Sequence, residues 1–132
     1  MPVLFDTSVL IDGEGLDLSS VEAEVILISA ISIGELAYGL GRGTPDEQRV
    51  RVTRFRRLVE GYEILPFNVE EAKLYGVLSD LLRAAGRNPR PRRLDLQIAA
   101  TAAVARVPIV TANPRDFEGL ERLVEVVPVS RP

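Results

Sequence analysis

Four acidic residues of the 132-residue chain are embedded in strongly apolar stretches, and they are Asp6, Glu35, Asp95 and Asp116. An ionised carboxylate that is taken out of water is costly unless it is paired with a cation or binds a metal ion. If the four side chains converge in the fold, their oxygen atoms would form a site for a hard divalent cation such as Mg²⁺ or Mn²⁺.

Each acid also has a purely local interpretation. Asp6 could cap the helical turn that follows it, and Glu35 stands three residues after Ser32, which is the spacing of a capping box. Asp95 could cap the helix that it opens, and Asp116 could belong to an ordinary turn. These interpretations stay open one by one, but together they do not explain why each acid lies in apolar sequence.

The chain contains neither cysteine nor histidine. The absence of cysteine excludes disulfides, thiolate nucleophiles and Cys-ligated zinc. The absence of histidine removes the commonest general base and a common ligand of zinc, copper and iron. Carboxylates that hold a divalent cation can still activate a bound water for in-line displacement at phosphorus. The composition therefore favours metal-dependent phosphodiester hydrolysis over acyl transfer.

The net charge of −3 argues against a broadly sticky nucleic-acid binder. No apolar run approaches the roughly 18 residues of a membrane span, and no secretory signal is indicated, so we expect a cytoplasmic protein that does not enter membranes. One stretch of eleven residues holds five basic residues and no acid: Arg83, Arg87, Arg90, Arg92 and Arg93. Such a run is either a solvated surface or a local patch that binds phosphate groups.

Short apolar segments alternate along the chain with amphipathic ones. Strands are predicted at Pro2–Phe5, Glu24–Ser29, Tyr62–Pro66, Val107–Thr111 and Leu123–Val129. For Glu24–Ser29 a helix is the alternative, because a continuous apolar run of that length has no diagnostic period. Helices or helical turns are predicted at Thr7–Asp12, Ser32–Leu40, Pro45–Glu60, Asn68–Ala85, Leu94–Ala105 and Pro114–Phe117. Gly86–Arg93 is predicted to be a loop.

This alternation predicts one α/β domain that spans residues 1–132, with a mostly parallel sheet covered by helices on both faces. In such sheets, ligands bind beyond the carboxyl ends of the strands. Asp6 closes the first predicted strand, and Asn113 and Asp116 follow a later one. Glu35 and Asp95 fall in the predicted first turns of two helices, so all of these positions could meet at one edge of the sheet.

Four blocks of the sequence, taken in order, resemble the PIN-domain ribonucleases, and specifically the VapC toxins of VapBC toxin–antitoxin systems. The blocks begin with Leu-Phe-Asp-Thr-Ser-Val-Leu-Ile at residue 4 and Ile-Gly-Glu-Leu-Ala-Tyr-Gly at residue 33. They continue with Leu-Asp-Leu-Gln-Ile-Ala-Ala at residue 94 and Ile-Val-Thr-Ala-Asn-Pro-Arg-Asp-Phe at residue 109. Each block alone is weak evidence, whereas four in this order cover nearly the whole chain.

The resemblance implies a PIN-like three-layer α/β/α sandwich and an endoribonuclease that depends on Mg²⁺ or Mn²⁺. It assigns metal binding and water activation to Asp6, Glu35 and Asp95, with Asp116 preferred to Asn113 for the fourth position. It places Thr7, Ser8 and Thr111 around the same pocket.

The resemblance also implies a homodimer and a cognate VapB-like antitoxin that covers the site. With a ribonuclease activity, the arginine-rich segment becomes a candidate RNA-binding region, formed by Arg87, Arg90, Arg92 and Arg93. The alternative function is that of a non-catalytic PIN-like module that binds RNA or protein.

Overall fold

The computed structural model describes residues 1–132 and contains one five-stranded sheet. The strands lie in the order β3-β2-β1-β4-β5, and every neighbouring pair is parallel. Their bounds are Pro2–Phe5 for β1, Val25–Ser29 for β2, Glu63–Leu65 for β3, Ile109–Thr111 for β4 and Val126–Pro128 for β5. The ambiguous apolar run is therefore a strand, as predicted, and the parallel sheet is confirmed.

Five helices connect the strands, and they are α1 (Thr7–Asp12), α2 (Ala30–Tyr38), α3 (Pro45–Gly61), α4 (Val69–Ala84) and α5 (Arg93–Ala105). Three 3₁₀ turns cover Gly13–Gly15, Arg90–Arg92 and Pro114–Phe117. All the predicted elements are present. The last strand is shorter than predicted, and part of the predicted Gly86–Arg93 loop is the 3₁₀ turn at Arg90–Arg92.

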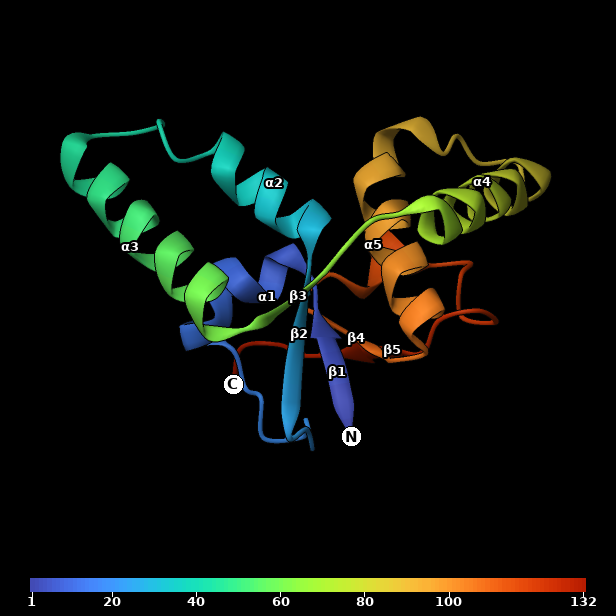
Figure 1. Ribbon diagram of the computed structural model, residues 1–132. Coiled ribbons are helices and arrows are strands. Elements are labelled where there is room, and N and C mark those ends of the chain that lie inside the picture. Colours follow the sequence, from blue (N-terminus) through green and yellow to red (C-terminus); the bar gives the residue numbers. More distant parts are fainter.

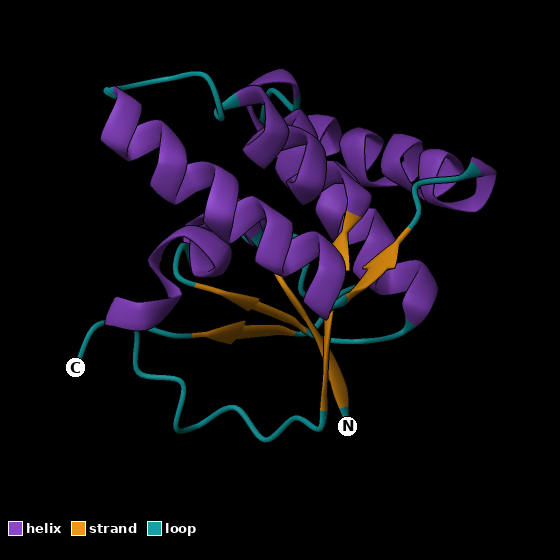
Figure 2. Ribbon diagram, turned by 60° about the vertical axis from the view of Figure 1, so that its left-hand side comes forward, coloured by secondary structure: helices purple, strands orange, loops and turns teal.

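The side chains of the central strands alternate between two apolar cores. Leu4 is paired with Leu27 and with Ile109, and all three belong to a core that α4 and α5 complete. Phe5, one residue later, faces the other way into a core that α1, α2 and α3 cover. This alternation is the two-residue period of a strand. The predicted three-layer α/β/α arrangement is thus confirmed, and Figures 1 and 2 show the two helical layers on either side of the sheet.

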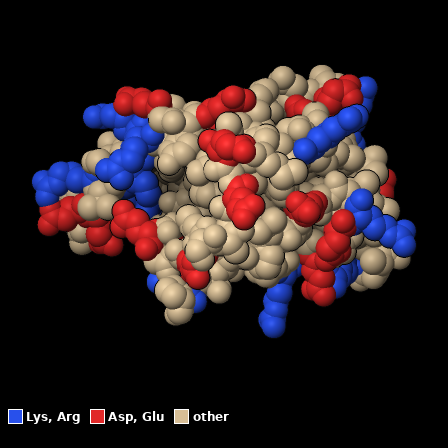
Figure 3. Space-filling view, turned by 90° about the horizontal axis from the view of Figure 1, so that it is seen from below, with Lys and Arg blue, Asp and Glu red and all other residues tan.

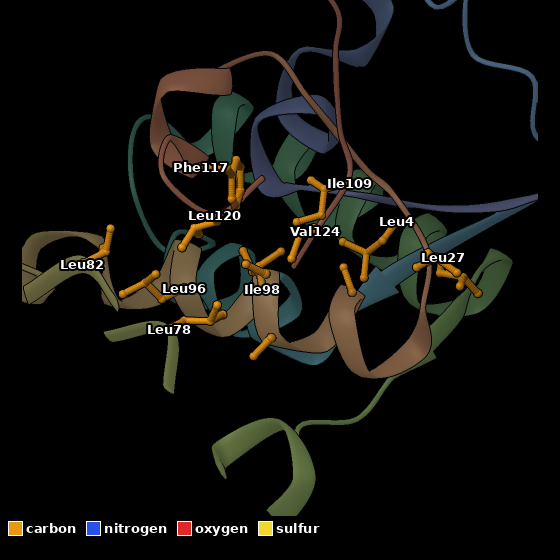
Figure 4. Close-up of a cluster of buried hydrophobic side chains, with 14 residues drawn as sticks. Leu4, Leu27, Leu78, Leu82, Leu96, Ile98, Ile109, Phe117, Leu120 and Val124 are labelled. Atoms are coloured by element: carbon orange, nitrogen blue, oxygen red, sulfur yellow. The ribbon is translucent and has the colours of Figure 1, made fainter. Parts of the chain in front are cut away.

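Phe117 anchors the 3₁₀ turn that carries Asp116. Its side chain is completely buried and belongs to the same core as Leu82, Leu96 and Leu120, which Figure 4 labels. Burying a phenyl ring of this size stabilises the fold by about 1.5–3 kcal/mol relative to exposure. The position of Asp116 is therefore set by a core contact rather than by a free loop.

The start of α2 corrects one local prediction. The helix begins at Ala30, and its cap is Ser29, whose hydroxyl accepts a hydrogen bond from the backbone N–H of Ile31 at 3.1 Å. Ser32 therefore lies inside the helix, and the capping-box interpretation of Glu35 is wrong. Glu35 is consequently in the second turn of α2 and not in the first.

The carboxyl ends of β1 and β2 point into the space between α2 on one side and α5 on the other (Figure 1). Figure 3 shows the opposite face, at the amino ends of the strands. In the middle of this face, single acidic side chains are scattered among uncharged residues, and basic side chains lie mainly toward the edges. No helix of the chain is both long and apolar enough to cross a bilayer. The predicted site residues are expected to meet at the edge where β1 and β2 end.

Candidate functional site

Asp6 lies at the carboxyl end of the central strand β1 and is only 3% exposed. Its Oδ2 accepts a hydrogen bond of 2.6 Å from the Thr111 hydroxyl, and its Oδ1 accepts bonds from the Ser8 hydroxyl and the Val9 backbone N–H. Burial raises the pKa of Asp6, although the bonds from Ser8 and Thr111 oppose the shift. The Val9 bond shows that Asp6 does cap α1, so the local interpretation and a site role hold for the same carboxylate.

The hydroxyl group of Thr7 orients the side chain of Glu35, which lies on α2. The Thr7 hydroxyl donates to Oε1 of Glu35 at 2.9 Å and lies 2.8 Å from the hydroxyl of Ser32. Burial raises the pKa of Glu35, the Thr7 bond lowers it, and the charge of Asp6 raises it further. Ser32 was not among the predicted site residues. Ser32 lies three residues before Glu35, a spacing that places both side chains on the same face of a helix, but the spacing had been interpreted as a capping box.

Asp95 comes from α5, on the other side of the strand ends from α2 (Figure 1). It is the third residue of α5, so it does not cap that helix, and the capping interpretation is wrong. Burial raises its pKa to about 7, and the charges of Asp116, Glu35 and Asp6 add to the shift in that order, whereas Arg92 opposes it. Three carboxylates from distant parts of the chain are therefore close enough to repel the ionised form of Asp95.

The two candidates for the fourth position differ in their environment. Asp116 is half-buried, and its charge is the largest electrostatic contribution to the raised pKa of Asp95. Asn113 is exposed, and its only interaction with the cluster is the bond of 2.9 Å from its backbone N–H to the Thr111 hydroxyl. The structure thus brings Asp116 toward the other acids more clearly than the side chain of Asn113.

The donor set suits a hard cation. All the candidate ligands are carboxylates that repel one another, and a divalent cation would offset that repulsion. No three acidic side chains come close enough to contact a single ion directly. This spacing fits Mg²⁺, which usually retains several waters and binds through one or two carboxylates, and so the remaining acids would act through those waters.

The arginine-rich segment divides into two groups. Arg92 donates to the carbonyl oxygen of Asp116 and, at 3.3 Å, to that of Glu118. Arg87 donates to the same Glu118 carbonyl at 3.3 Å and lies 3.6 Å from its carboxylate. Arg90 and Arg93 are exposed and form no ion pair. Two of the four predicted RNA-binding guanidinium groups are therefore engaged with the turn that carries Asp116.

Replacing Thr111 with Val is expected to destabilise the fold by about 1–3 kcal/mol, because the buried carboxyl group of Asp6 loses a hydrogen-bond donor while the side-chain shape is kept. The Thr111 hydroxyl also accepts the Asn113 N–H, so this amide loses its partner as well. Urea unfolding measures the effect. Thr111→Ser is the matched control and should retain most of the stability, and equal losses in the two variants would contradict the role given to the hydroxyl.

Comparison with known proteins identifies the family of the chain. The model of the PIN domain family matches residues 3–123 of the chain. A protein named Ribonuclease VapC from Rickettsia bellii (strain RML369-C) is 31% identical in an alignment of 132 positions, gaps included, that covers 93% of each chain. Ribonuclease VapC1 from Rickettsia felis (strain ATCC VR-1525 / URRWXCal2) is 30% identical in an alignment of 138 positions, gaps included, that covers 98% of each chain.

A solved structure is similar over almost the full length. It is VapBC-5 from Mycobacterium tuberculosis, a member of the VapBC family of toxin–antitoxin systems, and it matches with a TM-score of 0.81 and 26% identity over 96% of this chain and 98% of the other. FitAcB from Neisseria gonorrhoeae shares the fold with a TM-score of 0.77 at 24% identity, over 96% of each chain. With these matches and with the acids gathered at the carboxyl edge of the sheet, the chain belongs to the PIN domain family, and its relatives there are VapC ribonucleases.

Proposed function

We propose that this protein is an endoribonuclease that hydrolyses RNA phosphodiester bonds with a water bound to Mg²⁺ or Mn²⁺, and that it is the toxin of a toxin–antitoxin pair. The observation that carries the proposal is the placement of four acids, which follow β1 or lie on α2, on α5 and in the turn after β4; in agreement with it, burial and the charges of the other three acids raise the pKa of Asp95. The names of the two Rickettsia relatives support the ribonuclease activity.

The acids would share the work of holding the cation. Asp6 is fixed most firmly, by two hydroxyl groups and a backbone N–H, and Glu35 is oriented by Thr7. Asp95 on α5 and Asp116 in the turn after β4 would complete the set. When bound, the cation supplies a water of lowered pKa and stabilises negative charge on the leaving oxygen.

The antitoxin would cover the acids and the hollow next to them, which is lined by both apolar and charged side chains. A cavity of about 550 Å³ opens between α2 and α3, and Glu35 lines it together with Ile11, Leu36, Val50 and Phe55. An amphipathic segment of a VapB-like antitoxin could bury these apolar side chains and place a basic residue among the carboxylates. The similarity to VapBC-5, which belongs to a family of toxin–antitoxin systems, supports a partner of this kind. We extend the proposal to a homodimer on the basis of the family resemblance.

The test is cleavage of single-stranded RNA by the purified chain in Mg²⁺, in Mn²⁺ and in EDTA, with the new RNA ends mapped. We expect internal cleavage with either cation and none in EDTA. Equal cleavage in EDTA would refute the metal-dependent mechanism. RNA binding without cleavage under every condition would support the non-catalytic alternative.

A further inference from the structure

A second hollow, with basic but no acidic side chains in its lining, lies between α4 and the start of α5. It has a volume of about 440 Å³ and is lined by Arg83, Asn88, Arg90 and Arg93, with Tyr75 and Ser79 from α4. In Figure 1 this region is the connection between α4 and α5 at the upper right. None of its lining residues is acidic.

The groups in this hollow can donate hydrogen bonds but accept few. The guanidinium groups of Arg90 and Arg93 have no carboxylate within ion-pairing distance. Arg83 pairs with Asp80 at 2.6 Å, and Asp80 lies outside the lining. The Oδ1 of Asn88 accepts the backbone N–H of Arg90 at 3.1 Å, so its amide N–H₂ is left to donate. A tetrahedral phosphate oxyanion is the ligand that several guanidinium groups and an amide recognise together.

The hollow is built on rigid elements. Pro89 is buried, and Pro91 follows Arg90, so prolines restrict the backbone on both sides of this arginine. Ser79 donates to the carbonyl oxygen of Tyr75 at 2.9 Å within α4. A binding site whose backbone is already ordered loses little entropy when its ligand enters.

The hollow lies one helix away from the acids. Arg93 is the first residue of α5 and Asp95 is the third, so the two side chains leave the helix about 200° apart. The acids and the hollow are therefore separated by about one helix diameter, roughly 10–12 Å. A single RNA strand that crosses the start of α5 could reach both.

We infer that this hollow binds one backbone phosphate of the RNA substrate, a few nucleotides away from the bond that is cut. The inference rests on the proposed ribonuclease function and adds a phosphate subsite to it. Such a contact positions the strand without reading its sequence. It also divides the arginine-rich segment by role, since Arg90 and Arg93 hold RNA while Arg87 and Arg92 hold the turn that carries Asp116.

The first experiment measures binding of a single-stranded RNA in EDTA at several salt concentrations, in a chain made inactive by Asp6→Asn. Adding Arg90→Gln and Arg93→Gln is expected to weaken binding roughly tenfold and to make the salt dependence shallower by about 0.7 in log–log slope for each lost phosphate contact. The matched control is Arg56→Gln with Arg122→Gln, which removes two exposed arginines that form no ion pair. Arg90→Lys with Arg93→Lys retains the charge and should retain the slope. Identical slopes in the Gln pair and the control pair would overturn the inference.

The second experiment locates the phosphate. In cleavage assays, the active chain is given oligonucleotides with one uncharged methylphosphonate linkage, moved stepwise away from the cut site. One position should raise KM for the chain with Arg90 and Arg93 and have no further effect once both are Gln, as a double-mutant cycle requires for a direct contact. If no position behaves in this way, the inference is wrong.

The two proposals fail differently. Absence of cleavage by the unaltered chain refutes the proposed function, whatever the binding data show. Normal cleavage and RNA binding after both Gln substitutions refute only the phosphate subsite. If those substitutions instead weaken binding of the antitoxin and leave RNA affinity unchanged, the hollow binds acidic protein groups and the inference is also refuted.

Discussion

Asp95→Asn is expected to abolish RNA cleavage and at the same time to stabilise the folded protein at pH 8. The pKa of Asp95 is raised to about 7 because the side chain is buried and surrounded by other acids. The folded chain thus holds this proton more tightly than the unfolded chain does. The contribution of Asp95 to the free energy of unfolding is therefore most favourable below about pH 4, and it is lost as the pH rises from about 4 through 7. Asn carries no charge and avoids that loss.

The rise in the pKa of Asp95 would correspond to a loss of about 4 kcal/mol in the free energy of unfolding if it applied in full, but Asp95 is partly exposed and solvent screens its charge. We expect a gain of about 1–3 kcal/mol at pH 8, or roughly 3–10 °C in Tm. Thermal unfolding from pH 4 to pH 8 measures this effect, and the two proteins should converge near pH 4. Mg²⁺ should raise the Tm of the unaltered chain more than that of the variant. A variant that is less stable at pH 8 would contradict the repulsion.

Asp6→Asn is expected to reduce RNA cleavage by at least about a hundredfold, since even the outer partners of metal ligands change activity 10–100-fold. The fold should survive this change. The Asn oxygen can accept the bonds from Ser8 and Val9, and the Thr111 hydroxyl can turn to accept from the Asn amide. Cleavage rates at saturating Mg²⁺ and the thermal unfolding profile together measure the prediction.

Asp12→Asn is the matched control for Asp6→Asn. Asp12 is exposed at the other end of α1 and lies 3.9 Å from Arg131, far from the hydroxyl groups that hold Asp6. The Asp12→Asn variant should cleave RNA at the rate of the unaltered chain. If Asp6→Asn cleaves at that same rate while remaining folded, Asp6 is not a ligand and the metal site must be assigned to other residues.

Most secondary structure could be predicted because its signals are local. The cap at Thr44 and the following Pro45 begin α3 where predicted, and Thr44 forms the full capping box with Glu47. At the start of α4, the Glu71 side chain accepts a hydrogen bond of 2.7 Å from the backbone N–H of Asn68, three residues earlier. The cap of α2 was missed because Ser29 and Ser32 are both suitable cap residues by type. In the structure, β2 ends at Ser29, which pairs with Leu65 of β3, and α2 begins at the next residue.

By itself, the sequence determined that any metal site must be built from carboxylates, that strands and helices alternate, and that a parallel sheet would bring strand ends together. These conclusions depend on residue types and on periods of two and about 3.6 residues, which operate over short stretches of chain. The tertiary structure alone decided that the Thr111 hydroxyl holds Asp6 across 105 positions and that the Thr7 hydroxyl bonds both Glu35 and Ser32. It also decided that Arg92 turns toward Asp116 while Arg93 lines the hollow beside α4. Hydrogen bonds of this kind depend on the path of the chain between distant residues, and no local pattern in the sequence records that path.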